Sequence, residues 1–392
     1  MRHFVARVLL ALVWVSALVA GQTPDPVRIM DNPHAETIPD RFIVVFHGVT
    51  SVEQARSFSE EVGSGTFFHI GSRFKALVGA LLPEALARIQ ARGDLVAYIE
   101  PDQAVRLAAI SQKDPPWNLD RLDQRSLPLD NRYWYYDHAG AGASVYVLDT
   151  GINKSHVGFK GNLHYGWNFH DNTPYADDYH GHGTAVAGII GSENYGVAKS
   201  AAIFGVRVTD NAGSGTNSAL VQGIGFVAEA HRKSMRKMTV GSISLLTPAS
   251  QALDDAVLAA TEAGVLFVSA AGNGNGDACQ WSPGRLSEVL NVASVNNRDT
   301  RMSASNFGPC VDIFAPGDSI PTTGHASSTA VSYFSGTSAA APHASGVAAL
   351  VLANFGPRSP ADLRKYVLEM ATNNKVIDSQ GSPNRLLFSM FA

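Results

Sequence analysis

The chain has 392 residues, of which 45% are hydrophobic and 16% are charged. This length and composition allow a large buried core and favour about two domains with shorter accessory segments. The formal net charge of -4 provides no basic surface on which nucleic acid would bind. The overall charge therefore gives no reason to expect a nucleic-acid partner.

The first segment, residues 1–21, has the pattern of a secretory signal peptide. Arg2 and Arg7 precede an apolar run over residues 8–19, and small residues follow it. The run is too short for a membrane-spanning helix, and no later stretch of the sequence is long enough. We therefore expect a secreted protein that does not associate with membranes.

The next segment, residues 38–109, alternates between the apolar periods of strands and of helices. The pattern predicts strands over residues 41–46, 66–70, 76–81 and 96–100, and helices over residues 52–62 and 84–92. This βαββαβ order predicts a small ferredoxin-like α+β domain. Many binding domains share the order, so a regulatory or RNA-binding module is an alternative, although no Arg-Gly-Phe stacking signature supports RNA.

The remaining segment, residues 110–392, alternates buried strands with helices. The predicted strands cover residues 144–148, 202–208, 241–245, 265–270 and 290–294, and the predicted helices cover residues 217–231, 253–263 and 338–351. Alternation of this kind predicts an α/β domain with a doubly wound, mainly parallel sheet.

Three short motifs in the C-terminal segment contain the residue types of nucleophilic catalysis. Ser338 follows Gly-Thr and opens an apolar, alanine-rich helix. A serine hydroxyl attacks efficiently only when a base takes its proton and another group orients that base. Asp149 ends the strand at residues 144–148, and His182 lies in a glycine-rich turn before a buried helix. These two residues are the candidates for the orienting group and the base.

Each motif also has an ordinary structural explanation. A serine at a helix start commonly caps it, an Asp-Thr-Gly sequence commonly forms a turn, and a single histidine commonly fills a structural role. His180 and His182 could also be a metal-binding pair. The joint occurrence of all three motifs, in the chain order Asp, His, Ser, is what favours catalysis.

In order and spacing, the motifs around Asp149, His182 and Ser338 closely resemble those of the subtilisin-like serine proteases, in particular the branch typified by proteinase K. The resemblance extends from about Pro115 to the C-terminus. It implies that Ser338 is the nucleophile and that Asp149 orients the base. It also selects His182 over His180, because Gly-Thr follows His182 as in the family motif.

The resemblance implies further site residues. Asn273 would donate to the oxyanion together with the backbone N–H of Ser338. Two backbone segments would hold the substrate as an added strand; they are Gly213, Ser214 and Gly215, and Ser244, Leu245 and Leu246. The glycines are equally explained as loop residues. Relatives usually carry Gly-Gly after Ser-Leu, whereas this chain has Leu246-Thr247-Pro248, so the pocket size and the preferred substrate side chain stay open.

The same resemblance implies that residues 38–109 are an inhibitory propeptide. Residues 101–110 would then lie extended in the active-site cleft, and the mature peptidase domain would begin near Ile110 and cover residues 110–392. We expect Ser338 itself to make the cut.

The chain has two cysteines, Cys279 and Cys310. An even pair in an exported protein is most simply one disulfide, and the family branch commonly bridges the matching positions. Two buried free thiols are the alternative.

Calcium is the cofactor that the resemblance implies, as a structural ion. The first candidate site combines Asp120, Asp123, Gln124 and Asp130, which supply the oxygen ligands that a hard cation prefers. The alternative is an acidic helix whose charge is balanced by neighbouring arginines. A second candidate site uses Asp312 with backbone carbonyls near residues 287 and 289.

The sequence therefore predicts a secreted, monomeric serine endopeptidase that is made as a self-processed zymogen. It would hydrolyse a broad range of protein or peptide substrates through an acyl-enzyme. Two alternatives stay open at this point. One is a pseudoprotease that binds without turnover, supported by the bulky Leu246, and the other is a zinc hydrolase built on His180 and His182.

Overall fold

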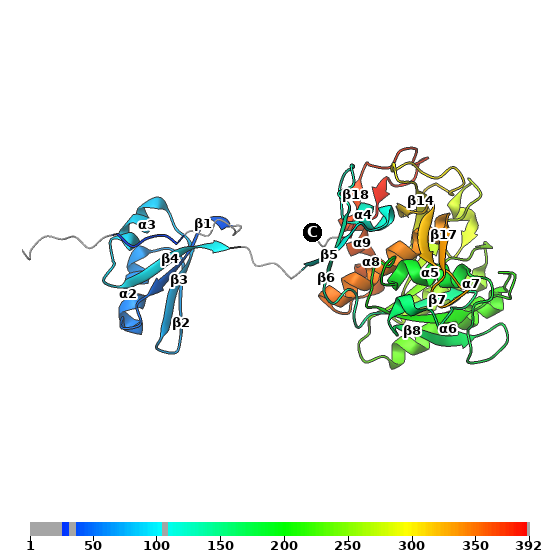
Figure 1. Ribbon diagram of the computed structural model, residues 1–392, viewed down its shortest axis with the longest axis horizontal. Coiled ribbons are helices and arrows are strands. Elements are labelled where there is room, and N and C mark those ends of the chain that lie inside the picture. The colour runs from blue at the N-terminus through cyan, green and yellow to red at the C-terminus, as the bar shows by residue number, and fades with distance from the viewer. Residues whose placement is uncertain (1–25, 31–36, 104–108, 390–392) are drawn as a thin grey trace, which may run out of the picture. The chain divides into compact units, whose positions relative to one another are not determined.

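The computed structural model describes residues 26–30, 37–103 and 109–389, and the chain divides into two compact units, residues 1–107 and 108–392 (Figure 1). The predicted signal peptide lies outside the described residues. Each unit is described separately below.

The N-terminal unit is a four-stranded antiparallel sheet with two helices. Its elements are β1 (Thr37–Phe46), α2 (Val52–Val62), β2 (Thr66–Ile70), β3 (Phe74–Ala80), α3 (Pro83–Gln90) and β4 (Val96–Gln103). The strand order β2-β3-β1-β4 is that of a ferredoxin-like unit. Both helices contribute to one apolar core, in which Phe58 and Ile89 pack with Phe46 and Leu77.

The C-terminal unit is built on a nine-stranded sheet with the order β18-β19-β15-β14-β12-β10-β7-β9-β8. Every neighbouring pair is parallel except β18 with β19, which confirms the predicted doubly wound, mainly parallel sheet. The strands are β7 (Ser144–Asp149), β8 (Leu163–Asn168), β9 (Ala202–Arg207), β10 (Thr239–Ile243), β12 (Leu266–Ala270), β14 (Leu290–Val295), β15 (Ile313–Pro316), β18 (Thr372–Asn373) and β19 (Arg385–Leu386).

The α-helices of this unit are α4 (Trp117–Leu122), α5 (His182–Gly191), α6 (Asn217–Lys233), α7 (Gln251–Glu262), α8 (Thr337–Phe355) and α9 (Pro360–Met370). Three small antiparallel pairs complete it. They are β5 (Ala109–Lys113) with β6 (Arg132–Tyr136), β11 (Thr247–Pro248) with β13 (Trp281–Ser282), and β16 (Ile320–Thr323) with β17 (Val331–Phe334).

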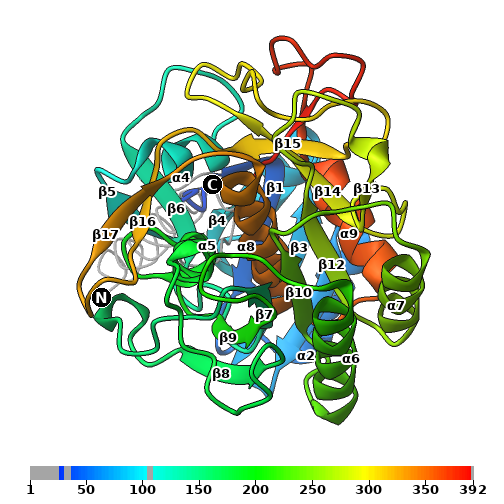
Figure 2. The ribbon, with the colours of Figure 1, turned by 90° about the vertical axis from the view of Figure 1, so that its right-hand side faces the viewer.

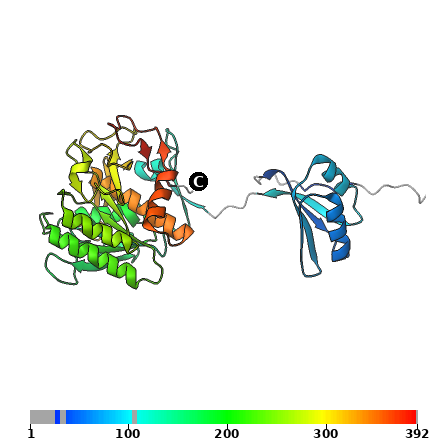
Figure 3. The same cartoon turned by 180° about the vertical axis from the view of Figure 1, so that it is seen from behind.

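The helices cover both faces of the sheet. In β7, Val145 and Val147 point into the core that contains α5, α8 and α9, whereas Tyr146 and Leu148 point into the core beneath α6 and α7. Figure 2 shows α8 against the middle of the sheet, and Figure 3 shows α6 and α7 side by side on the other face. Successive residues of a strand point to opposite faces, so a strand covered on both faces is apolar throughout.

Helix α8 is buried along most of its length, as its apolar sequence predicts. Gly346 shows how close the packing is, because a Cβ there would lie 2.6 Å from the Cβ of Val197. The nucleophile candidate Ser338 is therefore carried by a rigid element of the core.

The segment around the predicted cleavage point is described only in part. Residues 104–108 lie outside the described residues. Ala109 and Ile110 belong to β5 and pair with Tyr136 and Tyr135 of β6. Backbone pairing within the C-terminal unit therefore already includes the predicted first residue of the mature domain.

None of the helices in the described ranges is long and apolar enough to cross a membrane.

Cys279 and Cys310 form a disulfide, which confirms the predicted pairing over the free-thiol alternative. The bridge links the segment just before β13 to the loop that precedes β15.

Removing this bridge tests its contribution to stability. The cysteines are 31 residues apart. A loop of that size should contribute about 3 to 4 kcal/mol by restricting the unfolded chain. The test is the double variant Cys279→Ser with Cys310→Ser, made in a Ser338→Ala background to prevent self-digestion. We expect urea denaturation to show that its free energy of unfolding is about 3 to 4 kcal/mol lower than that of the Ser338→Ala protein. An unchanged denaturation midpoint would contradict this.

Candidate active site

Asp149 is the last residue of β7, at the carboxyl end of a central strand. Its side chain is fully buried. One carboxylate oxygen, Oδ1, accepts hydrogen bonds from the backbone N–H of Thr150 and from Nδ1 of His182, each over 2.7 Å. A buried carboxylate is tolerated when donors compensate its charge. Here the imidazole is one of those donors.

His182 is the first residue of α5, and its side chain is 19% exposed. The next residue must be glycine, because a Cβ on Gly183 would lie 2.1 Å from the carbonyl oxygen of Gly151. The turn after β7 and the start of α5 therefore touch backbone to backbone. This close approach holds the imidazole of His182 against Asp149.

Asp178 supports this arrangement, and the sequence analysis missed it. Its buried carboxylate accepts hydrogen bonds from Oγ1 of Thr150 (2.8 Å) and from the backbone N–H of Thr184 (2.9 Å). Oγ1 of Thr150 in turn accepts from the backbone N–H of Gly183 (2.9 Å). Asp178 thus ties the turn after β7 to the first turn of α5. The sequence offered one signal for Asp178, namely a carboxylate four residues before His182. An aspartate at that place is equally explained as an ordinary turn residue.

The electrostatics of the site raise the pKa of His182 above its ordinary value of 6.5. Burial alone would lower this pKa. The charge and hydrogen bond of Asp149, helped by the charge of Asp178, outweigh burial. The surroundings of His182 therefore favour the protonated imidazole more than water does.

Ser338 lies in the first turn of α8, behind Gly336 at the N-cap. Its Oγ donates to the backbone carbonyl of Ser244 over 3.2 Å, and its own carbonyl accepts from Oγ of Ser244 over 3.3 Å. That carbonyl is free because the residue four positions later is Pro342, which has no N–H to donate. The proline thus allows the segment after β10 to bind the backbone of Ser338.

Two contacts place Ser338 and His182 at the same end of neighbouring helices. The ring of Phe334, four residues before Ser338, meets the His182 ring edge to face at 5.0 Å between centroids. Further along, the carbonyl of Ile190 lies 3.3 Å from the Cβ that Gly346 would carry. In the described residues, no hydrogen bond joins Ser338 to His182, because the hydroxyl donates to Ser244 instead.

Asn273 follows β12 and faces the start of α8. Its side-chain oxygen accepts from the backbone N–H of Thr337 (2.9 Å) and from Oγ1 of Thr337 (3.1 Å). These bonds fix the orientation of the amide, so that its NH₂ group points away from Thr337. No acceptor within the described residues takes a hydrogen bond from that NH₂ group, which leaves it free to donate to a substrate.

The two predicted substrate segments face each other across a cavity of about 170 Å³. Gly213 and Gly215 line one side, and Leu245 and Leu246 line the other. Ser214 does not line this cavity but donates its N–H to Asp210. Ser244 is also absent from the lining and instead contacts Ser338. The structure thus brings four of the six residues together around one space.

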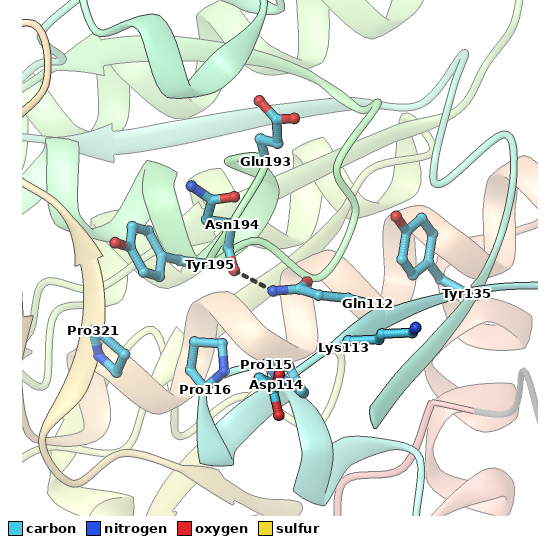
Figure 4. A pocket seen from close by; sticks show the side chains of 10 residues that line it. All are labelled: Gln112, Lys113, Asp114, Pro115, Pro116, Tyr135, Glu193, Asn194, Tyr195 and Pro321. Carbon is cyan, nitrogen blue, oxygen red and sulfur yellow. Dashed lines mark hydrogen bonds between the residues drawn. The ribbon is translucent and has the colours of Figure 1, made fainter. Parts of the chain in front are cut away.

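A larger cavity, of about 620 Å³, is lined by residues from β5, from the loop after α5 and from β16 (Figure 4). The side-chain amide of Gln112 crosses it and donates to the carbonyl of Asn194 over 3.0 Å. Its described lining does not include Asp149, His182 or Ser338. We assign it no part in the chemistry.

The first calcium candidate holds poorly compensated negative charge. Asp120 accepts hydrogen bonds from the side chain of Gln124 (2.7 Å) and the backbone N–H of Asp130 (3.3 Å). One oxygen of Asp123 accepts from the backbone N–H of Trp134 (2.6 Å), and the other is buried without a partner among the described residues. Burial, with the charges of Asp120 and Asp130, raises the pKa of Asp123 to about 7.

The alternative explanation for this acidic segment, charge balance by neighbouring arginines, is wrong. Arg121 forms a buried, two-pronged ion pair with Asp299 (2.7 and 2.9 Å). Arg125 donates to the carbonyl of Met370 over 2.6 Å. Both guanidinium groups are engaged with other parts of the unit. The acidic residues therefore fit a bound hard cation better than they fit a self-balanced helix.

The second calcium candidate already has a protein counter-ion. Arg364 forms an ion pair with Oδ1 of Asp312 and donates to the carbonyl of Val289 (3.2 Å). The other oxygen of Asp312 accepts from the backbone N–H of Asn291 over 2.9 Å. A cation at this place would have to displace the guanidinium of Arg364.

The zinc alternative needs a third ligand beside His180 and His182. Their ring centroids are 6.2 Å apart, and Nδ1 of His182 is engaged by Asp149. Over the described ranges, no group of three or more His, Cys, Asp or Glu side chains is gathered as a metal centre. This finding gives the zinc interpretation no support, and it applies equally to the carboxylates near Asp120.

Residues 140–386 match the family model described as the Subtilase family. The chain belongs to the subtilase family. Subtilases are serine proteases, so the predicted class of enzyme, a serine-type hydrolase, is confirmed. The matched residues include Asp149, His182, Asn273 and Ser338.

Individual relatives agree with the family match. This subtilase is 40% identical over 389 residues to alkaline serine exoprotease A of Vibrio alginolyticus, covering 94% of this chain and 71% of the relative. It is 46% identical over 310 residues to the extracellular serine proteinase of Thermus sp. strain Rt41A, covering 79% and 74%. A crystal structure of a cold-adapted subtilisin-like serine proteinase matches with a TM-score of 0.68 and 44% identity, over 71% of this chain and 99% of that one.

The charge coupling at His182 can be measured directly. In Ser338→Ala protein, NMR titration of the imidazole should give a pKa above 6.5. Asp149→Asn should lower that pKa, because it removes the charge and weakens the hydrogen bond that favour the protonated ring, and Asp178→Asn should lower it by less. His231 is the internal control, since burial lowers its pKa and neither aspartate is among the causes. An unchanged His182 pKa in Asp149→Asn would contradict the geometry.

Proposed function

We propose that this subtilase is a secreted serine endopeptidase made as a self-processed zymogen, with Asp149, His182 and Ser338 as its catalytic triad. The observation that carries the proposal is the 2.7 Å hydrogen bond from His182 to the buried Asp149, at the start of α5, where the His182 ring also contacts Phe334, four residues before Ser338. The name of the Thermus relative, an extracellular serine proteinase, supports secretion.

In the reaction, the Ser338 hydroxyl must turn from Ser244 toward His182 as substrate binds. Nε2 of His182 then takes the hydroxyl proton while Oγ bonds to the substrate carbonyl carbon. Asp149 stabilises the imidazolium that forms. When the C–N bond breaks, His182 gives this proton to the leaving amine. Water attacks the resulting ester in the same way, which releases the acid and restores Ser338.

The oxyanion has two donors in this scheme. One is the NH₂ group of Asn273, which the bonds to Thr337 leave free, and the other is the backbone N–H of Ser338. Both come from rigid surroundings, so they need little reorganisation as charge develops. Gly213 and Leu245 would hold the substrate backbone from opposite sides of the 170 Å³ cavity.

We propose that the N-terminal unit is the inhibitory propeptide. It has its own apolar core, and the division between the units at residues 107 and 108 lies close to the predicted cut near Ile110. A folded unit ahead of a protease cleavage point is well suited to occupy the site until it is released.

Self-processing is tested by purifying the full chain with and without Ser338→Ala in a protease-free system. The unaltered chain should convert to a mature form whose N-terminal residue lies near Ile110 and should hydrolyse protein substrates. Ser338→Ala should stay full length and inactive. Thr337→Ser, which keeps the hydroxyl that contacts Asn273, is the conservative control and should still process. Cleavage of purified Ser338→Ala would show that the cut is not made by this serine.

Subtilases commonly hold structural calcium, and we propose that the carboxylates of Asp120 and Asp123, with oxygens of Gln124 and Asp130, would hold such an ion here. The orphaned buried oxygen of Asp123 and its raised pKa fit a missing positive charge. When bound, the ion would supply charge balance in this segment and no chemistry.

Calcium should therefore raise the unfolding temperature of Ser338→Ala protein. A ligand at a hundred times its Kd stabilises by about 2.7 kcal/mol. The effect should be larger above pH 7 than at pH 5.5. The raised pKa means that the native state binds the Asp123 proton more tightly than the unfolded chain, so without calcium this group costs stability as pH rises from 3.8 to about 7.

The calcium effect should disappear in Asp123→Asn and persist in Asp312→Asn. Differential scanning calorimetry with and without calcium measures both. The reverse pattern, with loss only in Asp312→Asn, would assign the ion to the second candidate site instead.

A further inference from the structure

We propose that Leu246 closes the pocket that receives the substrate side chain on the acyl side of the cut, so that this enzyme cleaves after small residues such as alanine and glycine. The inference rests on the proposed function. It adds a specificity-determining residue and a substrate class to it.

The direction of the substrate follows from the roles of the site residues. The leaving nitrogen must lie beside His182, which protonates it, and the carbonyl oxygen must point to the NH₂ group of Asn273. The remaining bond of the attacked carbon runs to the Cα of the acyl residue. That Cα therefore faces away from His182, toward the segments that follow β10 and β12.

Both of these segments touch the nucleophile's helix. After β10, the carbonyl of Ser244 lies 3.2 Å from Oγ of Ser338. After β12, the N–H of Gly272 donates to Oγ1 of Thr337 over 3.0 Å. Since β10 and β12 are neighbouring parallel strands, the two segments form the walls of one gap beside Ser338. A substrate side chain on the acyl residue would enter this gap.

Leu246 crosses the gap. Its Cδ1 lies 2.7 Å from the point where a Cβ on Gly272 would be, so the leucine packs directly on the Gly272 backbone. Carbon atoms in contact are about 3.5 to 4.0 Å apart. The same Cβ would lie 2.4 Å from Nδ2 of Asn306, so only glycine fits at position 272 between the leucine and the asparagine. The space between Leu246 and Gly272 does not admit an aromatic ring or a long aliphatic chain.

The segment that carries Leu246 is held in place. Thr247 and Pro248 form strand β11, which pairs with Trp281 and Ser282 of β13. Just beyond, the N–H of Ala249 donates to the carbonyl of Gln280 over 3.1 Å. The wall is thus braced by a strand pair whose other strand begins two residues after the disulfide-bonded Cys279.

The other side of Leu246 lines the 170 Å³ cavity together with Gly213 and Leu220. If the leucine turned away from Gly272, it would enter that cavity and fill a second site for substrate side chains. In either orientation the leucine removes space from the substrate. The orientation present in the structure removes it beside Ser338.

The test is a set of peptides that differ only in the residue before the cut, assayed with mature enzyme and with Leu246→Ala. The ratio of kcat/KM for phenylalanine over alanine is measured within each enzyme, so it is independent of the fraction that is folded. The mature enzyme should prefer alanine by at least about tenfold, since steric exclusion of this kind is worth that much or more. Leu246→Ala should raise the ratio by at least about tenfold.

Met235→Ala is the control, because it shortens an apolar side chain that is 99% exposed and takes no part in the site. Its ratio should equal that of the unaltered enzyme. Equal cleavage after phenylalanine and alanine by the unaltered enzyme, or an unchanged ratio in Leu246→Ala, would overturn the inference while leaving the protease assignment intact. Absence of any cleavage, with no labelling of Ser338 by a phosphonate, would instead show that the proposed function has failed.

Discussion

The hydrogen bond between the buried Asp149 carboxylate and Nδ1 of His182 is the interaction on which the site depends. The carboxylate has no exposure to solvent, so its charge can be balanced only by groups that the fold brings to it. Among the described residues, the backbone N–H of Thr150 and the imidazole both donate to Oδ1, whereas Oδ2 is buried without a partner. The hydrogen bond from the imidazole to the carboxylate therefore couples the end of β7 to the start of α5. It also leaves Nε2 of His182 as the nitrogen available for chemistry.

The parallel sheet makes this coupling possible. Strands β7, β10 and β12 end at the same edge, and each delivers a different part of the site there. Asp149 ends β7, Ser244 follows β10, and Asn273 follows β12. Helix α8 brings Ser338 to the same edge from the core, where close packing at residues such as Gly346 prevents it from shifting. Groups held by strands and a buried helix are placed more accurately than groups on free loops.

Much of this architecture could be predicted from the sequence because burial leaves a local signature. The apolar run before Asp149 and the alanine-rich run after Ser338 each identify their element without help from the rest of the chain. Element ends were less well predicted. Helix α8 extends to Phe355 and not to residue 351. Strand β1 begins at Thr37 and not at residue 41, because Thr37 pairs with Gln103, 66 residues later in the chain.

Features that join distant residues could not be predicted. The role of Asp178 depends on Thr150, which lies 28 residues earlier, and the engagement of Asp312 depends on Arg364, which lies 52 residues later. The contact of Leu246 with Gly272 is of the same kind. The sequence shows a bulky residue at position 246, but only the fold shows what that residue touches.

The most direct measurement of the central claim is the rate at which a phosphonate reagent labels the enzyme as a function of pH, with peptide mapping of the label. We expect that Ser338 alone is labelled and that the rate rises with pH along the same titration curve as the His182 imidazole. Labelling at another residue, or a labelling rate that does not change as His182 titrates, would contradict the assignment of Ser338 and His182.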